Sequence, residues 1–130
     1  MQDAYSDNER RKSKRLKATF ILTYQVDKPL SLRIIMGWDR EVVGLMLDLS
    51  EEGMAVSTDC DIPVSTIIAM KFTLINLALD GEERTKSMKI TGEVKSNILL
   101  DKNEHRLGIH FIRIGQKDKD AITNFVKVAL

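Results

Sequence analysis

Met88-Lys89-Ile90-Thr91-Gly92-Glu93-Val94-Lys95 is the stretch of sequence that decides the fold class. Apolar and polar side chains alternate along it, which is the period of a β-strand with one buried face. The apolar face carries Met88, Ile90 and Val94, and the polar face carries Lys89, Thr91, Glu93 and Lys95. We therefore predict a strand over 88–99 whose apolar face lies in the core.

Similar strand signals recur on both sides of this stretch. They predict strands over 19–26, 42–49, 54–58, 67–77 and 107–114, and the apolar run 30–38 adds a further short strand. Turn residues separate them at 27–29, 80–81 and 101–104. In the strand over 42–49, strict alternation assigns the side chains to two faces: Val43, Leu45, Leu47 and Leu49 on one, and Gly44, Met46, Asp48 and Ser50 on the other.

The C-terminal segment has a different period. Ile122, Phe125, Val126 and Ala129 recur at helical spacing, with Asp118 and Asp120 near the start and Lys127 near the end, as the helix dipole favours. Six or so short strands followed by one helix indicate a mainly β protein. We predict a closed or nearly closed antiparallel barrel, an architecture that leaves few strand edges exposed.

Composition limits the class of protein. A chain of 130 residues, 43% hydrophobic and 30% charged, is typical of one globular domain. Cys60 is the only cysteine, so an intramolecular disulfide and a multi-cysteine zinc site are excluded. The sequence shows neither a signal-peptide pattern nor a long apolar run, and we expect a cytoplasmic protein without membrane insertion.

The N-terminal segment 1–15 is expected to form a flexible basic arm. Its end and the first residues after it carry six basic side chains, although the net charge of the whole chain is only +1: Arg10, Arg11, Lys12, Lys14, Arg15 and Lys17. Arg11 and Arg15 are four positions apart. Their planar guanidinium groups fit phosphate oxygens, or the O6 and N7 atoms of guanine, with paired hydrogen bonds.

A second polar motif follows the strand over 42–49. Asp48 and Ser50 are two positions apart, the spacing that puts two side chains of a strand on one face, and Gly53 ends the polar turn. A carboxylate can accept from the N1–H and N2–H₂ donors of guanine. Gly53 is expected where positive φ or close approach of backbones is needed. These residues also suit a purely structural turn cap, which is the competing interpretation.

RxxxR followed by DxSxxG resembles the PilZ domain family, which binds cyclic di-GMP. Gly108-Ile109-His110-Phe111 is similar to the G-x-x-F of that family's last strand, so the resemblance runs from about Glu9 onward. It implies a six-stranded antiparallel barrel of split-barrel type over 16–130, with its terminal helix at about 116–129 and the arm at 1–15.

One departure from the family pattern is the long connection from Arg15 to Asp48. Its extra length falls at 29–40, expected either to pack at the barrel rim, the interpretation we favour, or to dock a partner.

The resemblance implies that Arg11 and Arg15 bind phosphate and guanine, together with Asp48, Ser50 and Gly53. Arg10 is a third guanidinium that would engage a second ligand molecule or remain solvated. Asp48 and Arg15 are expected to be accessible to solvent. The arm would order when ligand binds, and a separate, unidentified effector protein would sense the change.

Other functions are less well supported by the sequence. His105 and His110 have no carboxylate pair or cysteine cluster at metal-binding spacing, and His110 is expected on a strand face. Cys60 has no nearby histidine to activate it as a nucleophile. We expect no enzyme activity, no metal and no cofactor apart from the nucleotide ligand. The alternatives are a ligand-independent adaptor of the same fold, or a nucleic-acid-binding barrel, which an aromatic content of 5% disfavours.

Overall fold

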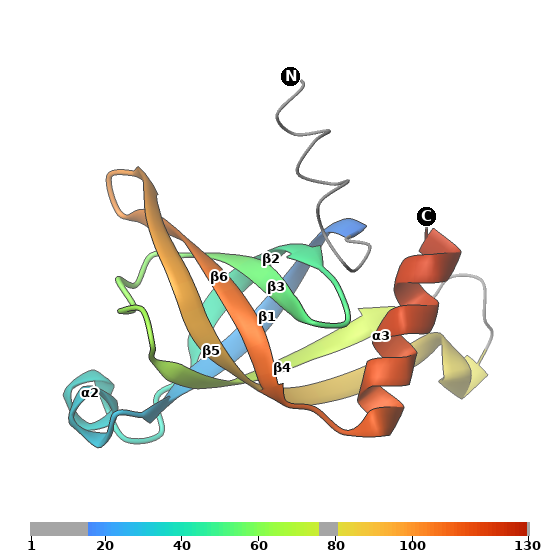
Figure 1. Ribbon diagram of the computed structural model, residues 1–130, viewed down its shortest axis with the longest axis horizontal. Helices are drawn as coiled ribbons and strands as arrows, with labels where there is room; N and C mark the ends of the chain where they lie inside the picture. Colours follow the sequence, from blue (N-terminus) through green and yellow to red (C-terminus); the bar gives the residue numbers. More distant parts are fainter. Residues whose placement is uncertain (1–15, 76–80, 130) are drawn as a thin grey trace.

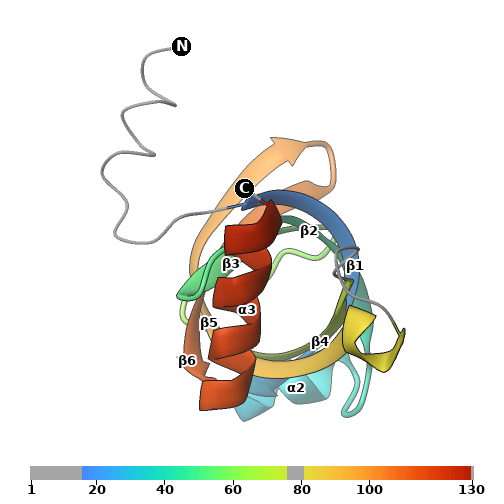
Figure 2. The same ribbon diagram turned by 90° about the vertical axis from the view of Figure 1, so that its right-hand side faces the viewer.

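The computed structural model describes residues 16–75 and 81–129. Six strands close into one antiparallel barrel in the order β1-β2-β3-β6-β5-β4, seen end-on in Figure 2. The elements are β1 (Leu16–Lys28), α2 (Leu30–Met36), β2 (Val42–Leu49), β3 (Gly53–Thr58), β4 (Ile67–Ile75), the 3-10 helix η1 (Gly81–Arg84), β5 (Thr85–Asp101), β6 (Glu104–Arg113) and α3 (Gln116–Ala129). The predicted six-stranded barrel and C-terminal helix are confirmed. The predicted arm 1–15 lies outside the described residues.

The core fills the barrel interior, and α3 covers one open end. Met88, Ile90 and Val94 are buried, so the in–out alternation of β5 is confirmed. Figures 1 and 2 show α3 lying across the end of the barrel opposite α2. The apolar side of α3 enters the same core cluster as the strands, through Ile122, Phe125 and Val126.

Tyr24 is the largest fully buried side chain of β1. Its phenol oxygen lies 2.7 Å from Oγ1 of Thr58, so the buried polar atom has a partner. Burial raises the pKa of the Tyr24 phenol well above its ordinary value. The residue therefore stays neutral at physiological pH and acts as a core residue with one satisfied polar end.

The prediction of a strand over the apolar run 30–38 is wrong. The chain forms the helix α2 there, and Pro29 precedes it, a position at which a missing backbone N–H does no harm. The N–H of Arg33 donates to the carbonyl of Pro29 at 3.1 Å, and Gly37 ends the helix with a φ of 99°. Leu32 and Met36 pack partly against the core, so this connection does contact the barrel rim.

Gly53 begins β3 where that strand runs very close to β6. A Cβ atom at Gly53 would lie 2.1 Å from the carbonyl oxygen of Ile109, far inside van der Waals contact. The residues with positive φ in the described chain are Gly37, Gly81 and Ser65, so Gly53 is not one of them. Of the two reasons predicted for this glycine, the structure supports close approach of two backbones.

We predict that Gly53→Ala lowers the free energy of unfolding by about 1–3 kcal/mol, because a backbone carbonyl must move to admit the methyl group. Urea denaturation followed by circular dichroism measures it. The matched control is Gly115→Ala, since a Cβ there meets nothing within 4 Å. Equal stability of the two variants would contradict the close approach of β3 and β6.

Candidate functional site

A one-residue irregularity in β2 decides where Asp48 points. Met46 faces the core, and strict alternation would send Asp48 inward as well. The register of β2 with β3 shifts between Met46 and Asp48, so Asp48 is opposite Ala55 and Leu49 is opposite Met54. Leu49 is fully buried in the core, which corrects the predicted faces: Leu49 points inward and Asp48 lies on the outer face beside Ala55.

Asp48 is held by two neighbouring strands. Its Oδ1 accepts a hydrogen bond from the backbone N–H of Ala55 at 3.1 Å, and its Oδ2 accepts one from Nη2 of Arg106 at 3.2 Å. Only 6% of Asp48 is exposed. The prediction that Asp48 is accessible to solvent is therefore wrong, and its carboxylate is already engaged within the protein.

Arg106 is the residue of this site that the sequence did not reveal. It is on β6, opposite Ser57 of β3 and opposite Ile98 of β5. Its neighbour Leu107 is buried in the core, so Arg106 itself belongs to the outer face. No local motif marks this arginine, because only the register of β2, β3 and β6 brings it beside Asp48.

Ser50 closes the turn between β2 and β3. Its backbone N–H donates to the carbonyl of Gly53 at 2.9 Å. Its hydroxyl oxygen accepts from the N–H groups of Glu52 and Gly53, both at 3.3 Å, and its O–H donates to the carbonyl of Gly53 at 3.3 Å. Ser50 is thus the structural cap of a tight turn, as the competing interpretation of the motif proposed.

The same turn is fastened to β6 and to α3. The N–H of Phe111 donates to the carbonyl of Glu52 at 2.9 Å. Oγ1 of Thr123 on α3 lies 2.8 Å from Oε2 of Glu51 and can donate to it. Close by, the rings of Phe20 and Phe125 pack edge to face with centroids 5.8 Å apart. The turn is therefore a fixed platform rather than a free loop.

The start of β1 lies beside this platform. Leu16 is opposite Leu49, and Lys17 is opposite Asp48. Arg10, Arg11 and Arg15 lie outside the described residues. In the sequence, Arg15 directly precedes Leu16.

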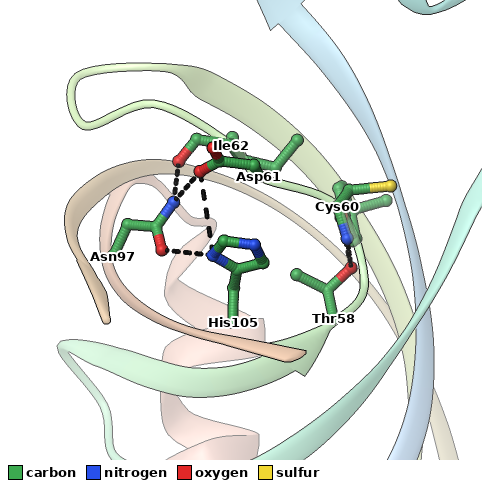
Figure 3. Close-up of polar contacts among 7 residues, drawn as sticks. Thr58, Cys60, Asp61, Ile62, Asn97 and His105 are labelled. Carbon is green, nitrogen blue, oxygen red and sulfur yellow. Dashed lines mark hydrogen bonds and ion pairs between the residues drawn. The ribbon is translucent and has the colours of Figure 1, made fainter. Parts of the chain in front are cut away.

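The histidines and the cysteine serve other purposes. Figure 3 shows a polar cluster on the β5–β6 hairpin, in which Nδ2 of Asn97 donates to Oδ1 of Asp61 and Nδ1 of His105 lies 2.9 Å from Oδ1 of Asn97. His110 is exposed on β6, as predicted for a strand-face residue. Burial and the neighbouring Asp59 carboxylate raise the pKa of the Cys60 thiol, which makes it a weak nucleophile at neutral pH.

Within residues 16–75 and 81–129, no three His, Cys, Asp or Glu side chains gather in a way that would hold a metal ion. The helices in the same part of the chain include none with the length and apolar content needed to span a membrane. What the described site offers is a carboxylate, a guanidinium and a capped turn on the outer face of a barrel.

Solved structures share this fold, among them the following three. The inhibitor of motility MotI/DgrA of Bacillus subtilis aligns with a TM-score of 0.70 and 15% identity over 92% of this chain, which spans only 51% of that protein. The PilZ domain of YcgR from Escherichia coli, solved with c-di-GMP, aligns with a TM-score of 0.61 and 15% identity, covering 92% of this chain and 90% of the other. The PilZ domain of CeSA from a cellulose-synthesizing bacterium aligns with a TM-score of 0.54 and 18% identity, covering 90% of this chain and 98% of the other.

No curated protein matches the sequence. The model of the PilZ domain family, in contrast, matches residues 9–127, a range that includes both arginines of RxxxR, the DxSxxG turn, the whole barrel and most of α3. Sequence family and barrel geometry agree over nearly the full length, and the chain is therefore a member of the PilZ domain family.

Proposed function

We propose that this protein is a cyclic di-GMP receptor that passes the signal to a separate effector protein. The observation that carries the proposal is the Asp48–Arg106 pair, with 3.2 Å between Oδ2 and Nη2, beside the capped DxSxxG turn. Membership of the PilZ domain family and the arginines of RxxxR support it. A relative of the same fold, the PilZ domain of YcgR, has been solved with this nucleotide.

The chemistry of the pair suits guanine. A carboxylate accepts from the N1–H and N2–H₂ donors of the base, while a guanidinium donates to O6 and N7. Asp48 supplies the first group and Arg106, or an arginine of the arm, supplies the second. Since Asp48 and Arg106 are bonded to each other in the structure, a bound guanine would replace their mutual hydrogen bond with bonds to the ligand.

The two phosphates of cyclic di-GMP need further cationic side chains to bind them. Arg11 and Arg15 are proposed to bind them, with Arg10 engaging a second ligand molecule if two bind. Ordering the arm costs about 1–2 kcal/mol per residue fixed. Each charge-assisted hydrogen bond returns about 1.5–3 kcal/mol, so several must form together. Ser50 and Gly53 contribute by shaping the turn on which the ligand rests.

A receptor of this kind works by binding rather than by catalysis. The proposal therefore includes no enzyme activity, no metal and a cytoplasmic location, where the effector would meet the ordered arm. Two competing functions remain as outcomes of the tests below: an adaptor that keeps the fold without using the nucleotide, and a nucleic-acid-binding barrel.

We predict that cyclic di-GMP binds with a dissociation constant of the order of micromolar, about −8 kcal/mol, in calorimetric titration. Arg15→Ala and Asp48→Asn should each weaken binding at least about tenfold, because each removes a charged hydrogen-bonding partner of the ligand. Arg106→Ala should weaken it as well. Arg113→Ala, on the same strand, is the matched control and should bind like the parent protein.

Asp48 is buried, so the same samples need a fold control. Thermal unfolding of Asp48→Asn should remain cooperative, because the amide oxygen can still accept from Ala55. Parent-like binding by both Arg15→Ala and Asp48→Asn would show that the site is wrongly assigned. Binding of oligonucleotides with a log–log salt slope near −4 to −5, without binding of the dinucleotide, would favour the nucleic-acid function.

We predict that hydrogen exchange of the backbone amides at 10–15 slows markedly when cyclic di-GMP is added. The six basic residues between positions 10 and 17 repel one another until phosphates neutralise them. Protection of these amides from exchange should therefore require ligand. Amides of β4, which pairs with β1 and β5 and not with β2, β3 or β6, serve as the internal control and should change little. Protection already present without ligand would refute the ordering switch even if binding is real.

A further inference from the structure

A groove lies between the outer face of the β1–β2 pair and the tip of the β5–β6 hairpin. We call it the hairpin groove. It encloses about 630 Å³, and its lining includes Ile21, Val43, Leu45, Ser57, Asp59 and residues 101–104. The hairpin extends beyond the body of the barrel, as Figure 1 shows for the upper ends of β5 and β6. β5 is able to project because it runs to Asp101, whereas its pairing with β4 stops at Glu93.

One wall of the hairpin groove is apolar and faces solvent. Ile21 is 71% exposed and Val43 is 63% exposed, on adjacent strands of the outer face where polar side chains are the norm. Leu45 of β2 belongs to the same wall, and the hairpin carries three further exposed apolar side chains, Ile98, Leu99 and Leu100, just before the lining residue Asp101. Large apolar side chains gathered around a groove are typical of a protein-binding surface.

The rim of the hairpin groove is acidic. Asp59 directly follows β3, while Asp101 and Glu104 flank the hairpin tip, and Lys102 is the one cation among the lining residues that the structure describes. An apolar wall with this rim complements a segment that combines apolar side chains with Lys or Arg. The same rim repels nucleic acid and anionic lipid, so it favours a protein segment over either of them.

The hairpin groove is continuous with the candidate site. Ser57 lines the groove, and it is opposite Leu45 on one side and Arg106 on the other. Arg106 is bonded to Asp48 at 3.2 Å. A ligand that takes over Asp48 must therefore change the bonding of a guanidinium adjacent to the groove, which gives the two sites a physical route of coupling.

We propose that the hairpin groove docks a segment of the effector protein in which apolar residues are interspersed with Lys or Arg. The apolar side chains of that segment lie against Ile21 and Val43, and its cations meet Asp59, Asp101 and Glu104. Docking itself depends only on this surface. Its control by cyclic di-GMP, through Asp48 and Arg106, rests on the proposed function.

The test uses the full chain and a fluorescein-labelled nine-residue peptide that alternates Lys with Ile. Two matched peptides carry Glu in place of Lys, or Ser in place of Ile. In fluorescence anisotropy the Lys/Ile peptide should bind, and the other two should bind at least about tenfold more weakly. Adding salt should weaken the Lys/Ile complex only in part, because apolar contact is unaffected by screening.

Variants locate the peptide. The double variant Ile21→Ser with Val43→Ser should bind the Lys/Ile peptide about tenfold more weakly than the parent protein. The double variant Asp101→Asn with Glu104→Gln should bind it at least about threefold more weakly. The matched controls are Ile112→Ser and Asp120→Asn, an exposed apolar and an exposed acidic residue outside the groove. Thermal unfolding confirms that each variant remains folded.

The outcomes separate the two proposals. If the Lys/Ile peptide does not bind, binds no better than the Glu/Ile peptide, or is weakened equally by the control variants, docking in the hairpin groove is overturned. Calorimetry with cyclic di-GMP on the same groove variants should give parent-like affinity. Peptide binding without any binding of cyclic di-GMP would leave the docking surface standing and would refute the proposed receptor function instead.

Discussion

The extra residue in β2 between Met46 and Asp48 is the constraint on which the site depends. It interrupts the alternation of the strand, sends Leu49 into the core and leaves Asp48 on the outer face. Without it, a carboxylate would point into an apolar barrel, which would cost several kcal/mol unless it were neutralised. The bulge lets one strand contribute Leu49 to the core and Asp48 to the outer face.

Asp48 is a nearly buried charge that forms its hydrogen bonds within the protein. Its oxygens accept from Ala55 and from Arg106, so it is satisfied although almost fully covered. Removing one member of such an ion pair leaves the charge of the other uncompensated, which costs free energy. A ligand that offers equivalent hydrogen bonds to the remaining member can take the place of the removed one at little net cost in free energy. The capped turn at Ser50, bound to β6 and close to α3, holds this arrangement in place. The geometry is thus fixed by contacts within the protein.

The segment between β1 and β2 shows where sequence reasoning failed. A short apolar run does not distinguish a strand from a helix, because neither period is sampled for long enough. Leu30–Met36 is helical because Pro29 and Gly37 start and stop it and because Leu32 and Met36 find partly buried positions on the barrel. These are tertiary contacts, which an isolated stretch of this length does not reveal.

The sequence alone determined the strands with clear alternation, the helix α3, the barrel class and the family motif, because each depends on local periodicity or on residues close together in the chain. It also identified Asp48, Ser50 and Gly53 as residues that belong together. The tertiary structure alone decided the direction of Asp48, the contact of Gly53 with Ile109, the partnership with Arg106 and the groove under the β5–β6 hairpin. These four features all depend on strand register. The register is fixed by pairing between segments far apart in sequence and by bulges that no local sequence pattern predicts.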